Sequence, residues 1–342
     1  MAIATTANFR YEVDKTIDKM FAFELARKQK YYSKIFTSKE APPGEDYTEA
    51  SMSALGLATT IGQGRRPNLD KPVEGNKKTR TYTKVGLSTQ LTRELLQDDI
   101  HSKWKELPKQ LVDSVIEKVE WDTAGVLYNG FSTSVGKDGL ALFANNHVTL
   151  KGAVTINNLL AGDFSPGALE AAMLYGMRFK AQNGFIRPIK PKKVIVGSAN
   201  AFLMAEIQKS LGRVYMNYMN SDGDIVAGAA GFADAGVNRI ASMAANTYNT
   251  TVNGNQLNRM NPSNGIVDAW EGIVNPYLTN GSNDDDSWFV LFEGAELDLF
   301  WKWQPELQKD ADEGTQSTQY FATARYAAFA NNYEYMVGSA GL

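Results

Sequence analysis

The clearest periodicity in the chain lies between residues 103 and 129. Apolar side chains recur there at every fourth position: Leu107, Leu111, Val115 and Val119. Charged side chains occupy most of the positions between them, so the segment is predicted to form an amphipathic helix. Pro108 is compatible only with the first turn, and Asn129-Gly130 provides a stop signal. Such a helix would be roughly 35–40 Å long, which is enough to serve as a strut.

Helical spacing also occurs near the N-terminus, within residues 9–36. Val13, Ile17 and Met20 share one face of a predicted helix. The helix could belong to an extended N-terminal arm or could dock on its own domain, and the pattern favours neither. Residues 41–50, which include Pro42-Pro43-Gly44, are interpreted as a breaker region.

Two further helices are predicted in the middle of the chain. Residues 165–184 begin with Ser165 as the N-cap and Pro166 at the first helical position, and the stop signal is Asn183-Gly184. Residues 189–211 are predicted to form a buried strand at Val194–Val196 that is followed by a helix.

The predicted strands lie mainly in the last part of the chain. Aromatic residues alternate with smaller ones in 288–303 and 316–339, a pattern typical of sheets, and a polar loop is predicted between them. Residues 137–152 indicate a turn and a strand. Residues 221–255, rich in Gly, Ala and Asn, are interpreted as loops and short elements. Helices and strands together indicate an α+β fold.

A long polar segment at residues 56–78 is unusual for a globular protein. It contains four Gly, two Pro and seven charged residues, whereas ordinary connections have about 4–6 residues. The alternation in 79–91 predicts a strand that returns from this segment. A two-stranded ribbon is only marginally stable alone, so we expect a neighbouring protein to support it. The charged side chains expected to contact that neighbour are Arg65, Arg66, Asp70, Lys71, Glu74, Lys77 and Lys78.

Composition narrows the function classes. The chain has 342 residues, no cysteine and a formal net charge of −3. Disulfides and thiolate metal sites are therefore excluded, and a protein dedicated to reading DNA would show a basic surface that is not indicated here. No transmembrane segment or signal peptide is evident, so synthesis in the cytoplasm and no membrane partner are expected.

Candidate chemistry is sparse. The two histidines, His101 and His147, lack a metal-binding spacing and are interpreted as surface or interface residues. The acidic run Asp284–Asp286 fits a solvated turn, and Asp98-Asp99 fits the start of the long helix. Gly62-Gln63-Gly64 lacks the third glycine of a dinucleotide fingerprint. We therefore predict no catalytic residue, no cofactor and no metal. The protein is not expected to be an enzyme.

The order of these parts resembles the major capsid proteins of tailed bacteriophages, which have the Hong Kong 97-type fold, and among them the Mu-like major head subunits. The resemblance covers roughly residues 80–330. It rests on YTKVGLSTQLTRELLQDD (82–99) before the long helix, DGLALFANNH (138–147), PKKVIVGSANAFLMAEIQKS (191–210) and 266–292.

The resemblance implies an architecture for the whole chain. Residues 1–50 would be the N-terminal arm, and 51–90 the extended loop with its return strand, lying over the adjacent subunit. Residues 91–184 would form the peripheral domain with the spine helix at 103–129. Residues 185–285 would form the axial domain, and 286–342 would return to the peripheral domain. The stretch 214–250 is longer than this pattern leads us to expect.

The resemblance also implies a function and partners. The chain would be a virion protein that assembles as hexamers and pentamers into an icosahedral shell around double-stranded DNA, contacted non-specifically. A portal, a scaffolding protein and decoration proteins would be further partners. Two alternatives are an encapsulin-type shell that encloses a cargo enzyme, and a metal-dependent hydrolase that uses Asp284–Asp286 with His147.

Overall fold

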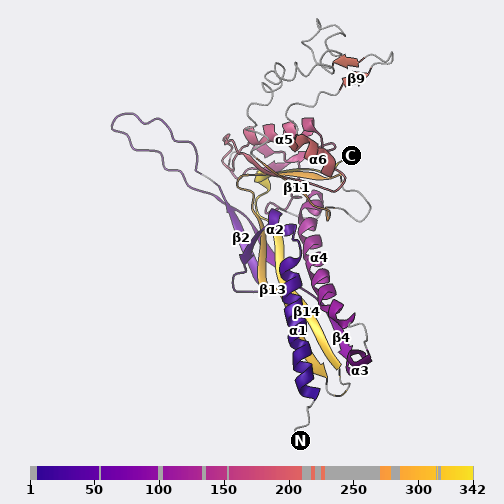
Figure 1. The fold of residues 1–342 in the computed structure, drawn as a ribbon. Helices are drawn as coiled ribbons and strands as arrows, with labels where there is room; N and C mark the ends of the chain where they lie inside the picture. Colours follow the sequence, from indigo (N-terminus) through magenta and orange to yellow (C-terminus); the bar gives the residue numbers. More distant parts are fainter. Residues whose placement is uncertain are drawn as a thin grey trace.

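The computed structural model describes residues 6–53, 55–98, 103–132, 136–151, 154–209, 217–219, 225–227, 270–278, 286–312, 314 and 317–341. Side chains are described from residue 15 onward, except at 93, 96, 97, 103, 209, 217–219 and 225–227. Figure 1 shows an elongated molecule in which two sheets follow one another along the long axis and a hairpin projects from the side.

The first sheet has four strands in the order β1-β13-β14-β4. Their bounds are Thr37–Glu40, Leu297–Asp312, Ser317–Ala330 and Thr83–Thr92. Strand β1 is parallel to β13, and the other pairs are antiparallel. Strands β13 and β14 are long because they form one hairpin that runs the length of this part of the molecule (Figure 1).

Helix α4 (Leu107–Tyr128) covers one face of this sheet and confirms the predicted long helix. Short 3-10 turns, Lys103–Glu106 and Asn129–Phe131, extend it at both ends. Strand β14 alternates small and aromatic side chains, so that Ala322, Ala324 and Tyr326 face the apolar stripe of α4. This alternation places a continuous core between helix and sheet.

Helix α1 (Thr6–Arg27) lies beside α4 (Figure 1). Ile17 and Phe21 are buried in the same core as α4, so this helix is docked on its own chain. The short helix α2 (Tyr32–Ile35) follows it and leads into β1. Helix α3 (Arg93–Asp98) joins β4 to the turn before α4.

The second sheet has five strands in the order β11-β8-β12-β15-β7. Their bounds are Glu271–Val274, Pro191–Val196, Trp288–Phe292, Met336–Ser339 and Leu159–Leu160. Helices α5 (Pro166–Met177) and α6 (Ala201–Lys209) pack near it. Met173, Val196 and Trp288 belong to a second core cluster, distinct from the one under α4. The predicted strand at 194–196 and the helix after it are therefore confirmed.

Small strand pairs complete the described residues. Strand β2 (Asp46–Met52) pairs with β3 (Glu74–Thr81), and β5 (His147–Val148) pairs with β6 (Thr155–Ile156). Strand β9 (Asn217–Met219) pairs with β10 (Ile225–Ala227). The remainder of 221–255, expected to form loops and short elements, lies outside the described residues.

Two predictions about element ends were wrong. The polar loop expected between 304 and 315 is mostly strand, because β13 continues to Asp312 and remains paired with β14. The helix expected to end at Asn183-Gly184 ends at Met177 instead. Phe179 then enters the core, and Lys180 forms an antiparallel bridge with Ile186, which uses backbone groups that a longer helix would need.

The Ser165 cap is confirmed in detail. Its side chain accepts the backbone N–H of Ala168 at 3.2 Å. No helix of the described segments is both long enough and apolar enough to cross a membrane.

Candidate assembly interface

The projecting ribbon is a hairpin of β2 and β3. Tyr47 lies opposite Arg80 and Glu49 lies opposite Lys78 in the antiparallel register.

Two predictions need correction here. The breaker region 41–50 contains the first five residues of β2, and the return strand expected over 79–91 is two strands that change partner at Tyr82. Before this residue the chain pairs with β2, and after it the chain pairs with β14.

The base of the hairpin is anchored to the body by aromatic packing. The Tyr47 ring lies 5.0 Å from the Phe300 ring and 5.9 Å from the Phe329 ring, measured between centroids. The guanidinium of Arg80 lies 5.0 Å from the centroid of Phe329 and donates to the carbonyl of Ala330 at 3.2 Å. The hairpin base is therefore part of the parent subunit rather than an unsupported ribbon.

A buried polar cluster also fixes the base. Lys137, whose side chain is 7% exposed, forms an ion pair with Glu49 at 3.0 Å. Beside it, His147 is fully buried, which corrects the expectation of a surface or interface histidine. Its Nδ1 lies 2.5 Å from a carboxylate oxygen of Asp138, and its ring stacks on Tyr333 at 3.9 Å.

Glu334 belongs to the same cluster. Burial raises the pKa of its carboxyl, while the amide of Gln182, which donates to it, acts in the opposite direction. Several partly desolvated charges thus meet where the hairpin joins the body. The Lys137–Glu49 ion pair links this cluster to β2.

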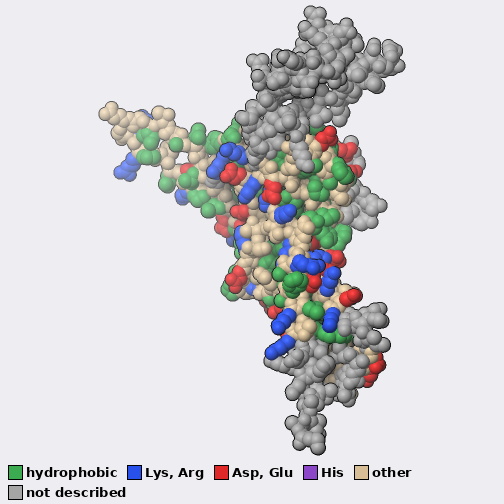
Figure 2. Space-filling view, viewed as in Figure 1, with side chains coloured by type: hydrophobic (Ala, Val, Ile, Leu, Met, Phe, Trp, Pro, Cys, Tyr) green, Lys and Arg blue, Asp and Glu red, His purple; other side chains and the backbone are tan. Residues whose placement is uncertain are grey.

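The outer part of the hairpin, residues 53–73, has few contacts of its own. The N–H of Ser53 donates to the carbonyl of Val73 at 2.8 Å, and the tip turns through the Arg65 N–H to Gly62 carbonyl bond at 3.1 Å. Six large apolar side chains are nevertheless exposed on this segment and at the end of β2: Met52 in β2, and Leu55, Leu57, Ile61, Leu69 and Val73 in the segment. Figure 2 shows apolar side chains along the projecting arm.

The seven charged residues predicted to contact a neighbour divide into two groups. Asp70 pairs with Lys151 of the body and accepts the N–H of Gly56 at 2.5 Å, and Glu74 pairs with Lys77 at 2.8 Å. In the part of the chain that the structure describes, no ion pair involves the remaining cations: Arg65, Arg66, Lys71 and Lys78. The hydrogen bonds and the Lys151 ammonium lower the pKa of Asp70.

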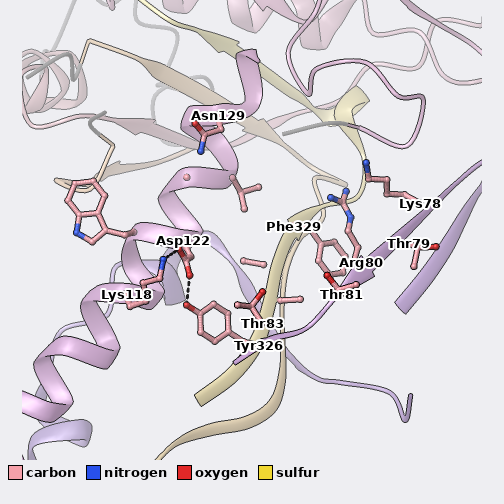
Figure 3. A pocket seen from close by; sticks show the side chains of 15 residues that line it. Lys78, Thr79, Arg80, Thr81, Thr83, Lys118, Asp122, Asn129, Tyr326 and Phe329 are labelled. Carbon is pink, nitrogen blue, oxygen red and sulfur yellow. Dashed lines mark hydrogen bonds and ion pairs between the residues drawn. The ribbon is translucent and has the colours of Figure 1, made fainter. Parts of the chain in front are cut away.

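A cavity of about 570 Å³ lies between α4 and the hairpin base. Figure 3 shows Lys78 and Arg80 on its β3 side, and Lys118, Asp122 and Tyr326 on the other. Asp122 accepts from Lys118 at 2.6 Å and from the Tyr326 hydroxyl at 2.7 Å, so its carboxylate is already engaged. Burial and the nearby Arg80 lower the pKa of Lys78.

Comparison with known proteins identifies the architecture. No family model and no curated protein matches the sequence. Among solved structures, the capsid of cyanophage P-SCSP1u superposes with a TM-score of 0.54, over 92% of this chain and 89% of that chain, at 7% identity. The chain has the Hong Kong 97-type capsid fold.

Two others among the matching structures cover most of the chain. A virus-like particle from Pyrococcus furiosus matches with a TM-score of 0.49 at 10% identity, over 95% of this chain and 98% of that chain. Gordonia phage Cozz matches with a TM-score of 0.49 at 12% identity, over 91% of this chain and 86% of that chain. The superposition on the cyanophage capsid makes the Hong Kong 97-type fold recognisable from the arrangement in space, whereas no family model or curated protein matches the sequence.

Sequence reasoning missed the residues that anchor the hairpin. Tyr47 and Glu49 lie in a segment that was interpreted as a breaker region, although the alternation in DYTEASM (46–52) is a strand signal. The apolar residues of the outer segment are spaced irregularly among glycines and charges. No periodicity could therefore have identified them.

Most of the remaining candidate residues lie outside the part of the chain that the structure describes. His101, Asp99, Asp284 and Asp285 lie outside the described residues. Among the residues that are described, no group of three His, Asp or Glu side chains could hold a metal ion.

Proposed function

We propose that this protein is the major subunit of a tailed-phage head, which assembles into an icosahedral shell around double-stranded DNA. One observation carries the proposal most directly. A hairpin whose base is fixed to the body holds six exposed apolar side chains away from it, on a subunit with a capsid fold.

The physical argument concerns burial. Leu57 and Leu69 are 74% and 88% exposed, and no element of their own chain is positioned to cover them among the described residues. Apolar groups gathered on a projecting segment mark an interaction site. A contact between a hairpin and a different surface of the next copy is heterologous, so it propagates until curvature closes it. A closed shell of identical subunits satisfies these conditions.

The proposal assigns a role to each part of the chain. Residues 1–50 act as the N-terminal arm and 51–90 as the extended loop over the adjacent subunit. Residues 91–184 and 286–342 form the peripheral domain, with α4 as its spine, and 185–285 form the axial domain. The first core cluster continues from under α4 to Ile195 and Phe289 of the second sheet, so it joins the two sheets.

The charged residues at the hairpin have two proposed roles. Arg65, Arg66, Lys71 and Lys78 bind carboxylates or carbonyls of the neighbouring subunit. Asp70, Glu74 and Lys77 shape the hairpin through the ion pairs described above, and contribute at its margin.

The wider assembly follows from the same proposal. The role is structural rather than enzymatic, and the mature location is the virion after synthesis in the host cytoplasm. Hexamers and pentamers of the chain meet a portal at one vertex. A scaffolding protein directs assembly, decoration proteins bind the outside, and the inner face contacts DNA non-specifically.

Electron microscopy of the expressed protein tests the proposal. The chain is expressed alone and together with the genes adjacent to it, and is examined by negative stain. A second variant replaces residues 57–69 by a short Gly-Ser turn, which keeps the paired strands β2 and β3 and their anchors intact.

We expect closed shells from the wild type, and a folded but unassembled subunit from the variant. Thermal melting of the variant should match the unassembled wild type. Wild-type protein that forms no shell under either condition contradicts the proposal. Shells purified from phage-producing cells that hold a protein cargo and no DNA would support a cargo container instead.

A further inference from the structure

The face of the first sheet opposite α4 carries a basic cluster, defined here as Lys84, Trp303 and Arg325. Arg325 on β14 lies in register with Lys84 on β4 and with Trp303 on β13, so the three side chains form one row across the sheet. The Lys84 ammonium is 5.9 Å and the Arg325 guanidinium 5.7 Å from the Trp303 ring centroid.

The two positive charges of this row have no carboxylate partner among the described residues. Like charges directly opposite each other on adjacent strands destabilise a sheet. Cation–π contact with Trp303 offsets part of this repulsion, but no described carboxylate pairs with Lys84 or Arg325. Glu306, which shares this face, accepts instead from the amide of Gln308 at 2.8 Å.

Two neutral donors near the row also lack acceptors. The indole N–H of Trp303 and the hydroxyl of Tyr82 are buried with no hydrogen-bond partner in the described structure. The Lys302 ammonium lies 4.8 Å from the Tyr82 ring centroid. Buried donors normally have partners, so the cluster has the character of a receptor for an acceptor-rich, negatively charged group.

The surface beside the cluster is open. A shallow groove of about 320 Å³ continues from Lys84 along β4 and β14, past Gly86, Ser88 and Phe321. Helix α4 covers the other face of these strands. A second polypeptide could therefore lie along this groove and reach the cluster.

Acceptors of the required kind lie at the end of the same sheet face. Asp310 and Asp312 are opposite Gln319 and Ser317 in the register, which places them on the face of Arg325, and both are exposed. At about 3.3 Å per residue, Asp310 is about 23 Å from Trp303 along β13. Because the strands between them are paired, these acids cannot reach the cluster of their own chain.

We propose that the basic cluster of one subunit binds the carboxylates at the β13–β14 tip of another copy of this chain. The inference rests on the proposed shell function and specifies one contact within it. Charge complementarity favours this occupant: the same face is basic near Arg325 and acidic at Asp310 and Asp312. Packaged DNA is the other polyanion available, and its binding is an outcome of the test.

A charge-swap experiment tests the contact. Variant one carries K84E and R325E, variant two carries D310K and D312K, and variant three combines all four changes. We expect each of the first two to lower the yield of closed shells at least tenfold, and the combination to restore most of it. Lys109→Glu, at an exposed position of α4, is the matched surface control and should assemble normally.

Folding is checked separately. Thermal melting of the unassembled variants should stay close to the wild type. If Arg325→Glu lowers the melting temperature, two other variants replace variant one. K84E alone changes an exposed residue, and Arg325→Met keeps an apolar stem over Trp303 without the charge.

Three outcomes overturn the contact. The first is a combined variant no better than its two parents, while the wild type assembles. The second is normal shell formation by variant one, which carries both K84E and R325E. The third is loss of packaged DNA, with normal shells, in variant one alone, which assigns the cluster to nucleic acid. Failure of the wild type to assemble overturns the shell proposal instead, so the two results are distinguishable.

Discussion

A carboxylate oxygen of Glu120, in the middle of α4, accepts the backbone N–H of Tyr32 at 2.9 Å. The other oxygen accepts the backbone N–H of Tyr31 at 2.7 Å. Glu120 is 1% exposed, so one buried acid joins α4 to the turn between α1 and α2. Burial raises the pKa of Glu120 to about 7, although both hydrogen bonds favour the ionised form.

This pKa predicts how subunit stability depends on pH. An ordinary glutamate titrates near 4.5. Between pH 4.5 and 7 the folded state therefore binds more protons at this site than the unfolded state, and stability falls as pH rises. The Glu120 contribution should decrease by about 3 kcal/mol across this window. Denaturant unfolding of the unassembled subunit at several pH values measures it.

Glu120→Gln is the matched control because it cannot ionise. The amide places a donor against a backbone N–H, so the variant should be destabilised, and its residue 120 adds no pH dependence because it does not titrate. The stability gap between wild type and variant should narrow as pH rises from 4.5 to 7. Other titrating groups, such as Glu334, cancel in this difference. A gap that stays constant would contradict the assigned pKa.

Two glycines of α5 should respond oppositely to alanine. At Gly176 an added Cβ would lie 2.4 Å from the Phe292 ring and 3.0 Å from the Ile189 carbonyl. At Gly167 an added Cβ meets nothing within 4 Å. Gly176→Ala should therefore destabilise the subunit by about 1–3 kcal/mol through overpacking, despite better helix propensity. Thermal or denaturant unfolding measures the change.

Gly167→Ala isolates the propensity effect. It should stabilise the subunit by about 0.5–1 kcal/mol, because alanine loses less backbone entropy in a helix. If both variants were stabilising, the close packing of α5 on β12 would be wrong.

The sequence predicted elements wherever periodicity and burial coincide. The four-residue repeat of α4 faces a core on one side only, so its pattern is strong. The Ser165-Pro166 start of α5 depends on local geometry alone, and it was also found correctly. Such signals need no knowledge of distant residues.

The errors arise where pairing across the chain outweighs local composition. The polar half of β13 is a strand because β14 supplies its hydrogen bonds, and charges suit its exposed faces. The change of strand partner at Tyr82 is likewise invisible in a continuous alternating pattern. The anchors of the hairpin, such as Tyr47 with Phe300, join residues more than 250 positions apart.

His147 should matter for stability rather than for catalysis. Its fully buried ring stacks on Tyr333 and contacts Asp138. His147→Ala should cost about 2–4 kcal/mol, because it leaves a cavity and removes the partner of one oxygen of the partly buried Asp138 carboxylate. His147→Phe keeps an aromatic ring over Tyr333, so its stability should lie between those of the wild type and the alanine variant. Unfolding curves that place the alanine variant within about 0.5 kcal/mol of wild type would show that the cluster is not a structural anchor.

The exposed leucines of the hairpin should matter for assembly and not for folding. Leu57→Asp and Leu69→Asp replace side chains that touch little of their own chain, so each should change subunit stability by less than about 0.5 kcal/mol. Shell yield, counted by electron microscopy or sedimentation, should fall at least tenfold, since each aspartate would be desolvated against the neighbour.

Gln63→Asp adds the same charge to the same segment but removes no apolar group. Gln63 is exposed at the turn of the hairpin tip. It should leave shell yield close to the wild type, which separates burial of the leucines from a general effect of negative charge. Equal loss of shells in all three variants would indicate that charge, not apolar contact, governs the hairpin interface. Unchanged yield in both leucine variants would show that the neighbouring subunit does not cover them.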